Sequence, residues 1–407
     1  VLPLIAAPIC VIFRSASLAW LIALIASWLC LGISIFLLEQ VISNGPISYL
    51  LGNWPAPWGI EYKVDVLSAF VMLIVTSIGA IVMVFAPKSV QIEIPSDRTY
   101  LFYTMYLLTF AGLLGITITA DAFNLFVFLE ISSLSSYVLI SLGAQRNALT
   151  AALRYLILGT VGATFYIIGV GLMYQMTGTL NISDLAERMP DVASTKTILI
   201  AVGFITVGIG LKLGLFPLHV WLPNAYAYAP SVVTAFLAAT ATKVAVYALL
   251  RVYFSIFGIN LFSALPIAEV LLILGLIAII SMSTVAIYQN NAKRLLAYSS
   301  VAQVGYMVIG IGMLTITGLT ATILHLFNHA VIKGALFLAL AAVFYRIKSV
   351  KVEDMAGLGK AMPYTMAAFV AAGFSLIGVP STVGFISKWY LILGALEKDW
   401  WLVAILI

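Results

Sequence analysis

The chain has 407 residues, of which 63% are hydrophobic and only 9% are charged, and its formal net charge is +5. Ordinary soluble domains carry about 25% charged residues, so this composition excludes a soluble enzyme, a disordered tail and a secreted disulfide scaffold. The apolar runs are continuous rather than alternating, which favours helices over a transmembrane β-barrel. The sequence therefore predicts an all-α polytopic membrane protein with about 12–14 transmembrane helices.

In chain order, the apolar runs predict spans at 1–13, 17–38, 64–86, 99–119, 122–143, 150–176, 197–216, 230–253, 266–288, 295–316, 319–345, 362–396 and 400–407. The first and last runs are short, and the chain opens at Val1 without Met, so we expect both ends to belong to a longer protein. Cys10 and Cys30 fall in apolar runs without metal-ligand spacing, so we expect both to be inert.

The basic residues of the loops divide unequally between the two sides of the membrane. One side holds Arg14, Lys88, Arg98, Arg146, Arg154, Lys293, Arg294, Arg346, Lys348, Lys351 and Lys360, and the other holds Lys63, Arg188, Lys196, Arg251 and Lys398. The side with eleven should be cytoplasmic. This predicts a plasma-membrane protein with its N-terminus outside, and the same bias explains the net charge without nucleic-acid binding.

Other ionisable residues lie within or beside the predicted spans. They are Glu130, Lys212, His219, Lys243, His325, His329, Lys333 and Lys388. Each ionisable group at membrane depth costs several kcal/mol unless it is paired or hydrated. The set predicts a polar, partly hydrated path through the protein.

Glu130 and Lys212 each have a functional and a structural interpretation. Glu130 has Ser133 on its helical face, and it either sets the protonation of a nearby lysine or serves as a structural carboxylate. Lys212 lies between Gly208 and Pro217, which predict a break in its helix. Such breaks mark ion sites in transporters, although the lysine could simply fill a carbonyl-lined break.

The second group of candidates occupies two more spans. Lys243 lies mid-span with Tyr247 at i+4, and a structural ion pair is the alternative to a proton site. His325, His329 and Lys333 are spaced i, i+4, i+8 and share one helical stripe. The lysine and the lack of a third ligand argue against a metal, so the spacing favours a proton relay.

Lys388 lies in a second broken span, which also contains Pro380, and it follows Lys212 by 176 residues. Two such breaks suggest a duplication of about five spans per copy, and an odd number inverts one copy. We expect units at 1–98, 99–253 and 266–407. His219 either binds the backbone at the first break or moves protons.

Several cofactor signals are missing from the sequence. It has no Walker A sequence, no cysteine cluster for iron–sulfur and no histidine pair spaced for two haems. We therefore expect no cofactor, no metal and no energy source within this chain.

Four stretches resemble one known family. They are Asn124–Glu130 with its serine-rich tail, Gly210–Pro217 with the following His219–Pro223, Lys243–Arg251, and His325–Lys333. They are similar to the antiporter-like subunits of complex I, membrane-bound hydrogenases and Mrp antiporters. The resemblance runs from about residue 64 to the end, and Phe126–Ile140 and Thr177–Leu185 look most like the D-type component of Mrp antiporters.

The resemblance implies two inverted five-helix repeats with discontinuous helices at Lys212 and Lys388. It also implies that Glu130 pairs with Lys212, and that Lys243 and the His/Lys stripe connect this pair to Lys388. Some relatives have an acid where this chain has Lys388. In the second half of the chain, the only acid within a predicted span is Glu269, which lies near the start of its span.

Three functions are compatible with these observations. The first is an ion-translocating subunit of an Mrp-type Na⁺(K⁺)/H⁺ antiporter, a secondary transporter rather than an enzyme. Its partners would be a second antiporter-like subunit, small membrane subunits and lipids. The second is a proton-pumping subunit of a complex I-like oxidoreductase or hydrogenase, which would hold no redox centre. A passive scaffold is the third, and it leaves the intramembrane charges unexplained.

Overall fold

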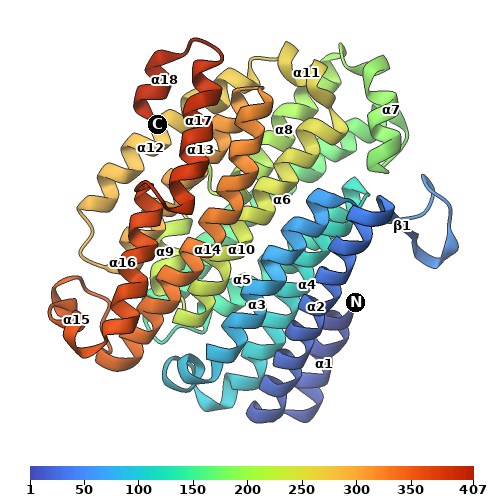
Figure 1. Cartoon of the computed structure of the whole chain (residues 1–407). Coiled ribbons are helices and arrows are strands. Elements are labelled where there is room, and N and C mark those ends of the chain that lie inside the picture. The colour runs from blue at the N-terminus through green and yellow to red at the C-terminus, as the bar shows by residue number, and fades with distance from the viewer.

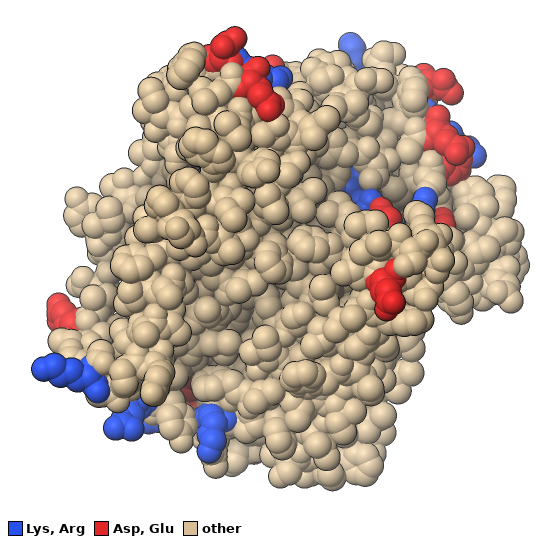
Figure 2. Space-filling model, viewed as in Figure 1, with Lys and Arg blue, Asp and Glu red and all other residues tan.

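The computed structural model describes residues 1–407 as a bundle of helices (Figure 1). Ten helices are long and apolar enough to cross a membrane, and three shorter apolar helices accompany them. Figure 2 shows a broad belt without charge between charged residues at the two ends of the helices. The prediction of an all-α polytopic membrane protein is therefore confirmed.

The N-terminal part packs as a helical layer with a small hairpin at one end. Its elements are α1 (Leu2–Phe13), α2 (Ala16–Asn44), β1 (Ile47–Leu50), η1 (Leu51–Asn53), β2 (Glu61–Val64), α3 (Val66–Glu93) and η2 (Ser96–Arg98). The carboxylate of Asp65 begins α3 by accepting a hydrogen bond from the backbone N–H of Ser68. The sequence predicted only a loop before α3, because strands of four residues are too short to produce a clear alternating pattern.

The middle part of the chain forms the first repeat. Its elements are α4 (Thr99–Ile118), α5 (Ala122–Ser141), α6 (Arg146–Thr177), α7 (Ile182–Val192), α8 (Lys196–Leu213), α9 (Leu222–Tyr228) and α10 (Ser231–Leu250). The π-helical segment η3 (Arg251–Ile256) and α11 (Gly258–Ala264) follow. Helix α10 is buried along almost its whole length, because α3, α4, α8 and other helices surround it.

The last part forms the second repeat. Its elements are α12 (Ile267–Ile287), α13 (Ala292–Gly312), α14 (Ile316–Ile347), η4 (Glu353–Met355), α15 (Leu358–Ala361), α16 (Pro363–Ile377), α17 (Val383–Leu396) and α18 (Trp401–Leu406). Helix α14 packs along α10, so this contact joins the two repeats at the centre of the bundle.

Matching backbone hydrogen bonds relate the two repeats. The N–H of Ala122 donates to the carbonyl of Leu180, and the N–H of Ala292 donates to that of Val350, both at 2.8 Å. The donor and the acceptor of the second hydrogen bond each lie 170 residues after those of the first (292 − 122 and 350 − 180). The first link lies at the hairpin end of the bundle and the second near α15 at the opposite end (Figure 1). The repeats are therefore inverted.

Both expected helix breaks are present. Helix α8 ends because Gly214 adopts a left-handed φ of 72°, and a Cβ there would lie 2.8 Å from a methyl carbon of Leu222. The chain resumes as α9 after eight residues that include Pro217. Helix α16 ends at Gly378, and α17 begins after a short segment that includes Pro380.

The two ends of the bundle differ in their elements and their charge. One end, the hairpin face, carries β1, β2, α7 and α11, and the other, the basic face, carries α15 (Figure 1). Arg98 directly before α4, Arg146 at the start of α6 and Lys348 at the end of α14 belong to the basic face. Basic side chains predominate at the lower end in Figure 2, near α15. The assignment of the basic face to the cytoplasm stays a prediction.

Candidate functional site

Glu130 on α5 and Lys212 on α8 form an ion pair inside the bundle. The lysine Nζ lies 2.9 Å from the Glu130 Oε1 and also donates to the Ser133 Oγ at 2.7 Å. The Lys212 side chain is 5% exposed, against 20% for Glu130. Because an unpaired charge at this depth costs several kcal/mol, each residue depends on the other.

Two aromatic side chains, Trp221 and Tyr155, stabilise the helix break that follows Lys212. The Trp221 Nε1–H donates to the carbonyl of Leu211 at 2.9 Å, and this carbonyl belongs to the last turn of α8. The indole also stacks on Tyr155, with ring centroids 3.8 Å apart. The break is therefore a built structure that holds the end of α8, and Lys212 with it, in place.

His219 lies in the same break but does not bind its backbone through the ring. The imidazole stacks on Phe216 at 5.4 Å, and its buried Nδ1 has no hydrogen-bond partner. Only the backbone carbonyl of His219 takes part, by accepting from the N–H of Leu222 at 2.9 Å. One of the two interpretations of His219, a hydrogen bond from its ring to the backbone of the break, is not realised because the ring packs against Phe216 instead.

A small cavity of about 20 Å³ lies beside Lys212. Ser132, Ser133, Ser136 and Tyr155 supply polar groups to its wall. A polar cavity of this size can hold about one water molecule. The surroundings of Lys212 therefore allow a proton to leave by way of a single water.

Lys243 on α10 is fully buried and has no acidic partner. Its Nζ donates to the carbonyl of Ala238 and, at 3.3 Å, to the Thr242 Oγ1. On the facing helix α14, a Cβ added to Gly334 would meet the Ala239 Cβ at 3.7 Å. Because α10 and α14 pack closely here, Lys333, the neighbour of Gly334, lies near the turn of α10 that precedes Lys243.

The stripe on α14 contacts two further helices. Lys333 donates from Nζ to the Leu296 carbonyl at 2.8 Å and to the Ser299 Oγ at 2.7 Å, both on α13. Its neighbour His329 stacks on His325 with ring centroids 6.1 Å apart. Both His329 nitrogens are buried without a hydrogen-bond partner, so no neighbouring side chain fixes the central imidazole in one tautomer.

The far end of the stripe reaches α17. The His325 Nδ1 shares a hydrogen bond of 2.9 Å with the Ser387 Oγ, and Lys388 is the next residue. The Lys388 Nζ donates to the Ile377 carbonyl at 2.9 Å and lies 4.6 Å from the ring centre of Tyr306. A carbonyl and an aromatic face thus stabilise this lysine in place of an acid.

Residues 119–407, well over half of the chain, match the family described as "NADH:quinone oxidoreductase/Mrp antiporter, TM". The chain belongs to this family. It is an antiporter-like membrane subunit, as the sequence motifs predicted.

Relatives of both kinds match most of this antiporter-like chain. The N-type component of the NADH-quinone oxidoreductase of Desulforudis audaxviator is 45% identical over 378 residues, which are 92% of this chain and 74% of the relative. The D-type component of the Na⁺/H⁺ antiporter of Alkalihalophilus pseudofirmus is 34% identical over 377 residues, 91% of this chain and 74% of the relative.

A solved structure supports the same family. A chain of the Mrp complex from Dietzia sp. DQ12-45-1b superimposes with a TM-score of 0.91 at 27% identity, covering 99% of this chain and 74% of that one. The expected likeness to the antiporter-like subunits is therefore confirmed. The finer choice of the D-type Mrp component stays a prediction, since relatives of both classes match.

Lys293 is one buried charge that sequence reasoning in this antiporter-like chain missed. The loop counts assigned it to the basic side, but it is only 4% exposed at the start of α13, and its Nζ donates to the Ala229 carbonyl at 3.2 Å. The segment between α9 and α10 covers it. A lysine at the start of a span is normally solvated, so nothing in the sequence indicated that another segment buries Lys293.

Asp65 and Arg251 form a second ion pair that the sequence did not indicate. The guanidinium binds the Asp65 carboxylate through Nη2, and it donates from Nε to the Tyr247 Oη at 2.9 Å. Burial acts to raise the pKa of Asp65, but Arg251 and the backbone N–H of Ser68 outweigh it and hold the pKa below its usual value. The only signal was an acid at the start of one predicted span and a base near the end of another.

The site residues form no metal centre. No three histidine, cysteine, aspartate or glutamate side chains lie together as a group that could hold a metal ion. The structure therefore brings together four sets of titratable groups, which are the Glu130–Lys212 pair, Lys243, the α14 stripe and Lys388.

Proposed function

We propose that this chain translocates protons as the ion-translocating subunit of a multisubunit Mrp-type Na⁺(K⁺)/H⁺ antiporter. The protons move along Glu130, Lys212, Lys243, Lys333, His329, His325 and Lys388. The observation that carries the proposal is the succession of these groups on α5, α8, α10, α14 and α17, in helices that pack against one another. In this function the chain is a secondary transporter subunit and not itself an enzyme.

The partners of these groups suit the transfer of a proton. Lys243 and Lys333 bind carbonyls and hydroxyls rather than carboxylates, so no fixed counter-ion retains their charge. A proton that arrives at one lysine repels the charge on the next and favours its onward release. Lys212 differs because Glu130 stabilises its charge, which makes this pair a site where a proton can be held.

The proposed setting is a complex in the plasma membrane. Partners would be a second antiporter-like subunit, small membrane subunits and lipids, and the transported ions would be H⁺ and Na⁺ or K⁺. We propose residues 99–253 and 266–407 as the two translocating units, with 1–98 as an N-terminal helical layer. The proposed orientation has the N-terminus outside.

A second candidate is the proton-pumping membrane subunit of a complex I-like oxidoreductase or membrane-bound hydrogenase. The 45% identity to the N-type component of an NADH-quinone oxidoreductase favours it. The test is to purify the complex through a tag on this chain and analyse its subunits and absorption. Small membrane subunits without iron–sulfur absorption support the antiporter, whereas iron–sulfur proteins with quinone- or hydrogen-dependent proton pumping support the redox-driven assembly.

The decisive variant for proton translocation is Lys243→Met. Methionine fills a similar volume without a charge, and replacing a buried charge by an apolar group often leaves stability unchanged or raises it. We expect assembled complex in normal amounts with cation/proton exchange lost, and a matched Lys360→Met change at an exposed site should leave exchange intact. Near-normal exchange in everted vesicles containing Lys243→Met would contradict the proposal.

A further inference from the structure

A polar cavity of about 350 Å³ lies at the hairpin face, where β2, α3 and α7 meet the end of α10. Eight of the residues in its wall are polar or charged, namely Lys63, Asp65, Ser68, Thr119, Ser183, Tyr247, Arg251 and Ser255. Lys63 is tied to the wall by donating to the Ser183 Oγ at 3.2 Å. The translocation line described above uses none of these residues.

The floor of this hairpin-face cavity is a hydrogen-bonded network around Tyr247. The Tyr247 hydroxyl donates to the carbonyl of Thr117 at 2.8 Å and lies 2.9 Å from the Ser68 Oγ. The Arg251 Nη2 also donates to the Ser68 Oγ at 2.9 Å. Tyr247 is only 2% exposed, so the network carries polar groups from the mouth of the cavity into the packed interior.

The small cavity beside Lys212 lies one helical turn deeper. In the last turn of α4 Ile116 lines the small cavity, and Thr119, the residue that follows this helix, lines the large one; on α10 the corresponding residues are Ala245 and Tyr247. Three residues of an α-helix rise about 4.5 Å. The two cavities are therefore separated by a single layer of side chains.

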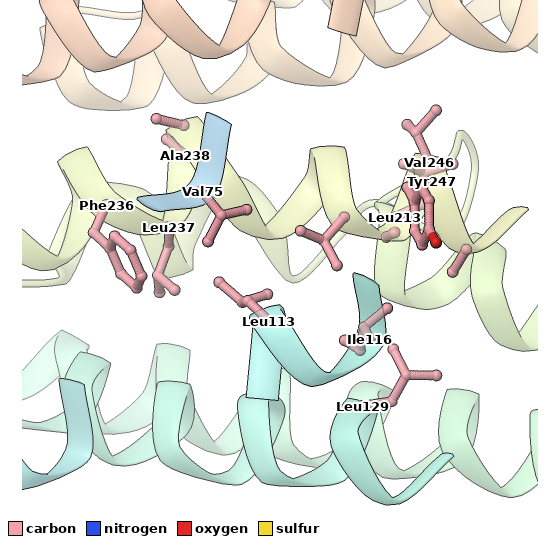
Figure 3. Close-up of a cluster of buried hydrophobic side chains, with 14 of the residues drawn as sticks. Val75, Leu113, Ile116, Leu129, Leu213, Phe236, Leu237, Ala238, Val246 and Tyr247 are labelled. Atoms are coloured by element: carbon pink, nitrogen blue, oxygen red, sulfur yellow. The ribbon is translucent and has the colours of Figure 1, made fainter. Parts of the chain in front are cut away.

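That layer is apolar. Ile116 and Leu129 line the small cavity on its hairpin side and are 1% and 4% exposed. Figure 3 shows both side chains pointing from α4 and α5 toward the ribbons of α8 and α10, which carry Leu213 and Tyr247. An apolar constriction of this thickness excludes water when closed and conducts when wetted.

We propose that the hairpin-face cavity is a second proton access site for Lys212, closed in this conformation by the layer of Ile116 and Leu129. This inference rests on the proposed function, because a site that exchanges protons between two compartments must be reached from each side in turn. Wetting of the layer would connect Lys212 by water to the Tyr247 network and the hairpin face.

The charges of the cavity suit protons rather than metal cations. Two basic side chains, Lys63 and Arg251, face one acid, Asp65, and Arg251 already binds that acid. A fixed guanidinium beside a narrow path repels Na⁺ and K⁺, whereas protons can pass through hydrogen-bonded water. The access site is therefore specific for protons.

The test uses variants that make the layer polar in the assembled complex. Ile116→Ser and Leu129→Ser should raise passive proton leak about tenfold in vesicles without a Na⁺ or K⁺ gradient, which corresponds to ~1.4 kcal/mol off the barrier. The matched control is Leu107→Ser on the same helix α4, which is buried but touches neither cavity. Adding Lys212→Met should abolish the leak, and Na⁺ flux should stay unchanged.

Three results would overturn the proposal: a leak no larger than that of Leu107→Ser, a leak that persists with Lys212→Met, or a leak that carries Na⁺.

A labelling experiment tests the proposal even if the leak variants assemble poorly. In a background of Cys10→Ser and Cys30→Ser, a membrane-impermeant maleimide applied at the hairpin face should label Thr119→Cys. It should label Ile116→Cys only when Leu129→Ser is also present, and labelling of Ile116→Cys without that change would contradict a closed layer. Failure of the proposed function is a separate outcome, since it is decided by exchange in Lys243→Met.

Discussion

Lys212 and Lys388 lie on opposite sides of the breaks in their helices. Lys212 occupies the last turn of α8 before its break, whereas Lys388 lies in α17, after the break, and reaches back to the Ile377 carbonyl at the end of α16. When the left-handed glycines that end α8 and α16, Gly214 and Gly378, are aligned, Lys212 corresponds to Leu376 instead. The two lysines are therefore not copies of one position.

The 170-residue displacement between the starts of α5 and α13 explains the difference in the partners of the two lysines. Glu130 aligns with Ser300, since 130 + 170 = 300, so the second repeat has no acid at this position. Lys212 has a carboxylate as counter-ion, and Lys388 has only a carbonyl dipole and the Tyr306 ring. A charge on Lys212 is therefore balanced by a carboxylate, whereas a charge on Lys388 faces no acid.

The Glu130–Lys212 pair leads to the first prediction. Glu130→Gln removes the negative charge beside the Lys212 ammonium and leaves it with neutral hydrogen-bond partners, and breaking a buried pair costs about 3–5 kcal/mol. We expect lower thermal stability and no cation/proton exchange in everted vesicles, with the complex still assembled. The double variant Glu130→Gln/Lys212→Met should regain stability but not exchange. Glu39→Gln on exposed α2 is the control, and near-normal exchange in Glu130→Gln would exclude a role for the pair.

The two buried histidine environments lead to the second prediction. His329→Ala should slow transport strongly and shift its pH optimum, because this imidazole is the unpartnered centre of the α14 stripe and lies between Lys333 and His325 in the proposed proton path. His219→Ala should lower stability by about 1 kcal/mol through loss of stacking on Phe216, and it should leave the pH profile unchanged. Rates measured from about pH 6 to 9 in both variants, a range that brackets the ordinary titration of imidazole, check this, and identical profiles would rule out the relay.

The ion pair at the hairpin face leads to a prediction about acid stability. In the folded protein the pKa of Asp65 lies below its usual value, so the carboxylate stabilises the fold above about pH 4. This contribution is lost as the pH falls further, through the lowered pKa. Asp65→Asn should reduce stability at pH 7 by about 1.5–3 kcal/mol, as expected for a charged hydrogen-bond acceptor, and should flatten the loss below pH 4.

Melting curves of the purified complex between pH 7 and pH 3 measure this effect. Asp97→Asn is the matched control, because Asp97 is exposed and its contact with Arg98 is a surface pair at 3.8 Å. Equal acid sensitivity of Asp65→Asn and the parent protein would contradict the assignment.

The sequence was informative where a pattern is local. The i, i+4, i+8 spacing placed His325, His329 and Lys333 on one face of α14, and the structure has them there. The glycine and proline positions also indicated both helix breaks, because backbone conformation depends on neighbouring residues. Composition alone determined the fold class, since so few charges cannot cover a soluble surface.

Partners across the bundle could not be read in the same way. The contact of Lys333 with Ser299 depends on how α13 and α14 align, and periodicity in one helix does not determine that alignment. Lys293 and Arg251 lie at the ends of spans, where charged residues normally reach water, so their burial had no local signal. The Ile116 and Leu129 layer is likewise indistinguishable in sequence from any other apolar contact.

Lys388 leads to the last prediction, which separates a fixed charge from a titrating one. Arginine can keep the hydrogen bond to the Ile377 carbonyl and the contact with the Tyr306 ring, so Lys388→Arg should assemble normally. A guanidinium stays protonated at every pH the protein meets, so it cannot pass a proton on. We therefore expect no exchange in Lys388→Arg, while Lys360→Arg at an exposed site should behave as the parent protein. Lys388→Glu should keep partial activity, because a carboxyl group can still bind and release a proton and some relatives resembling this chain have an acid here. Full exchange in Lys388→Arg would mean that the residue acts only through its charge, and proton release at this end of the line would then have to come from the neighbouring His325.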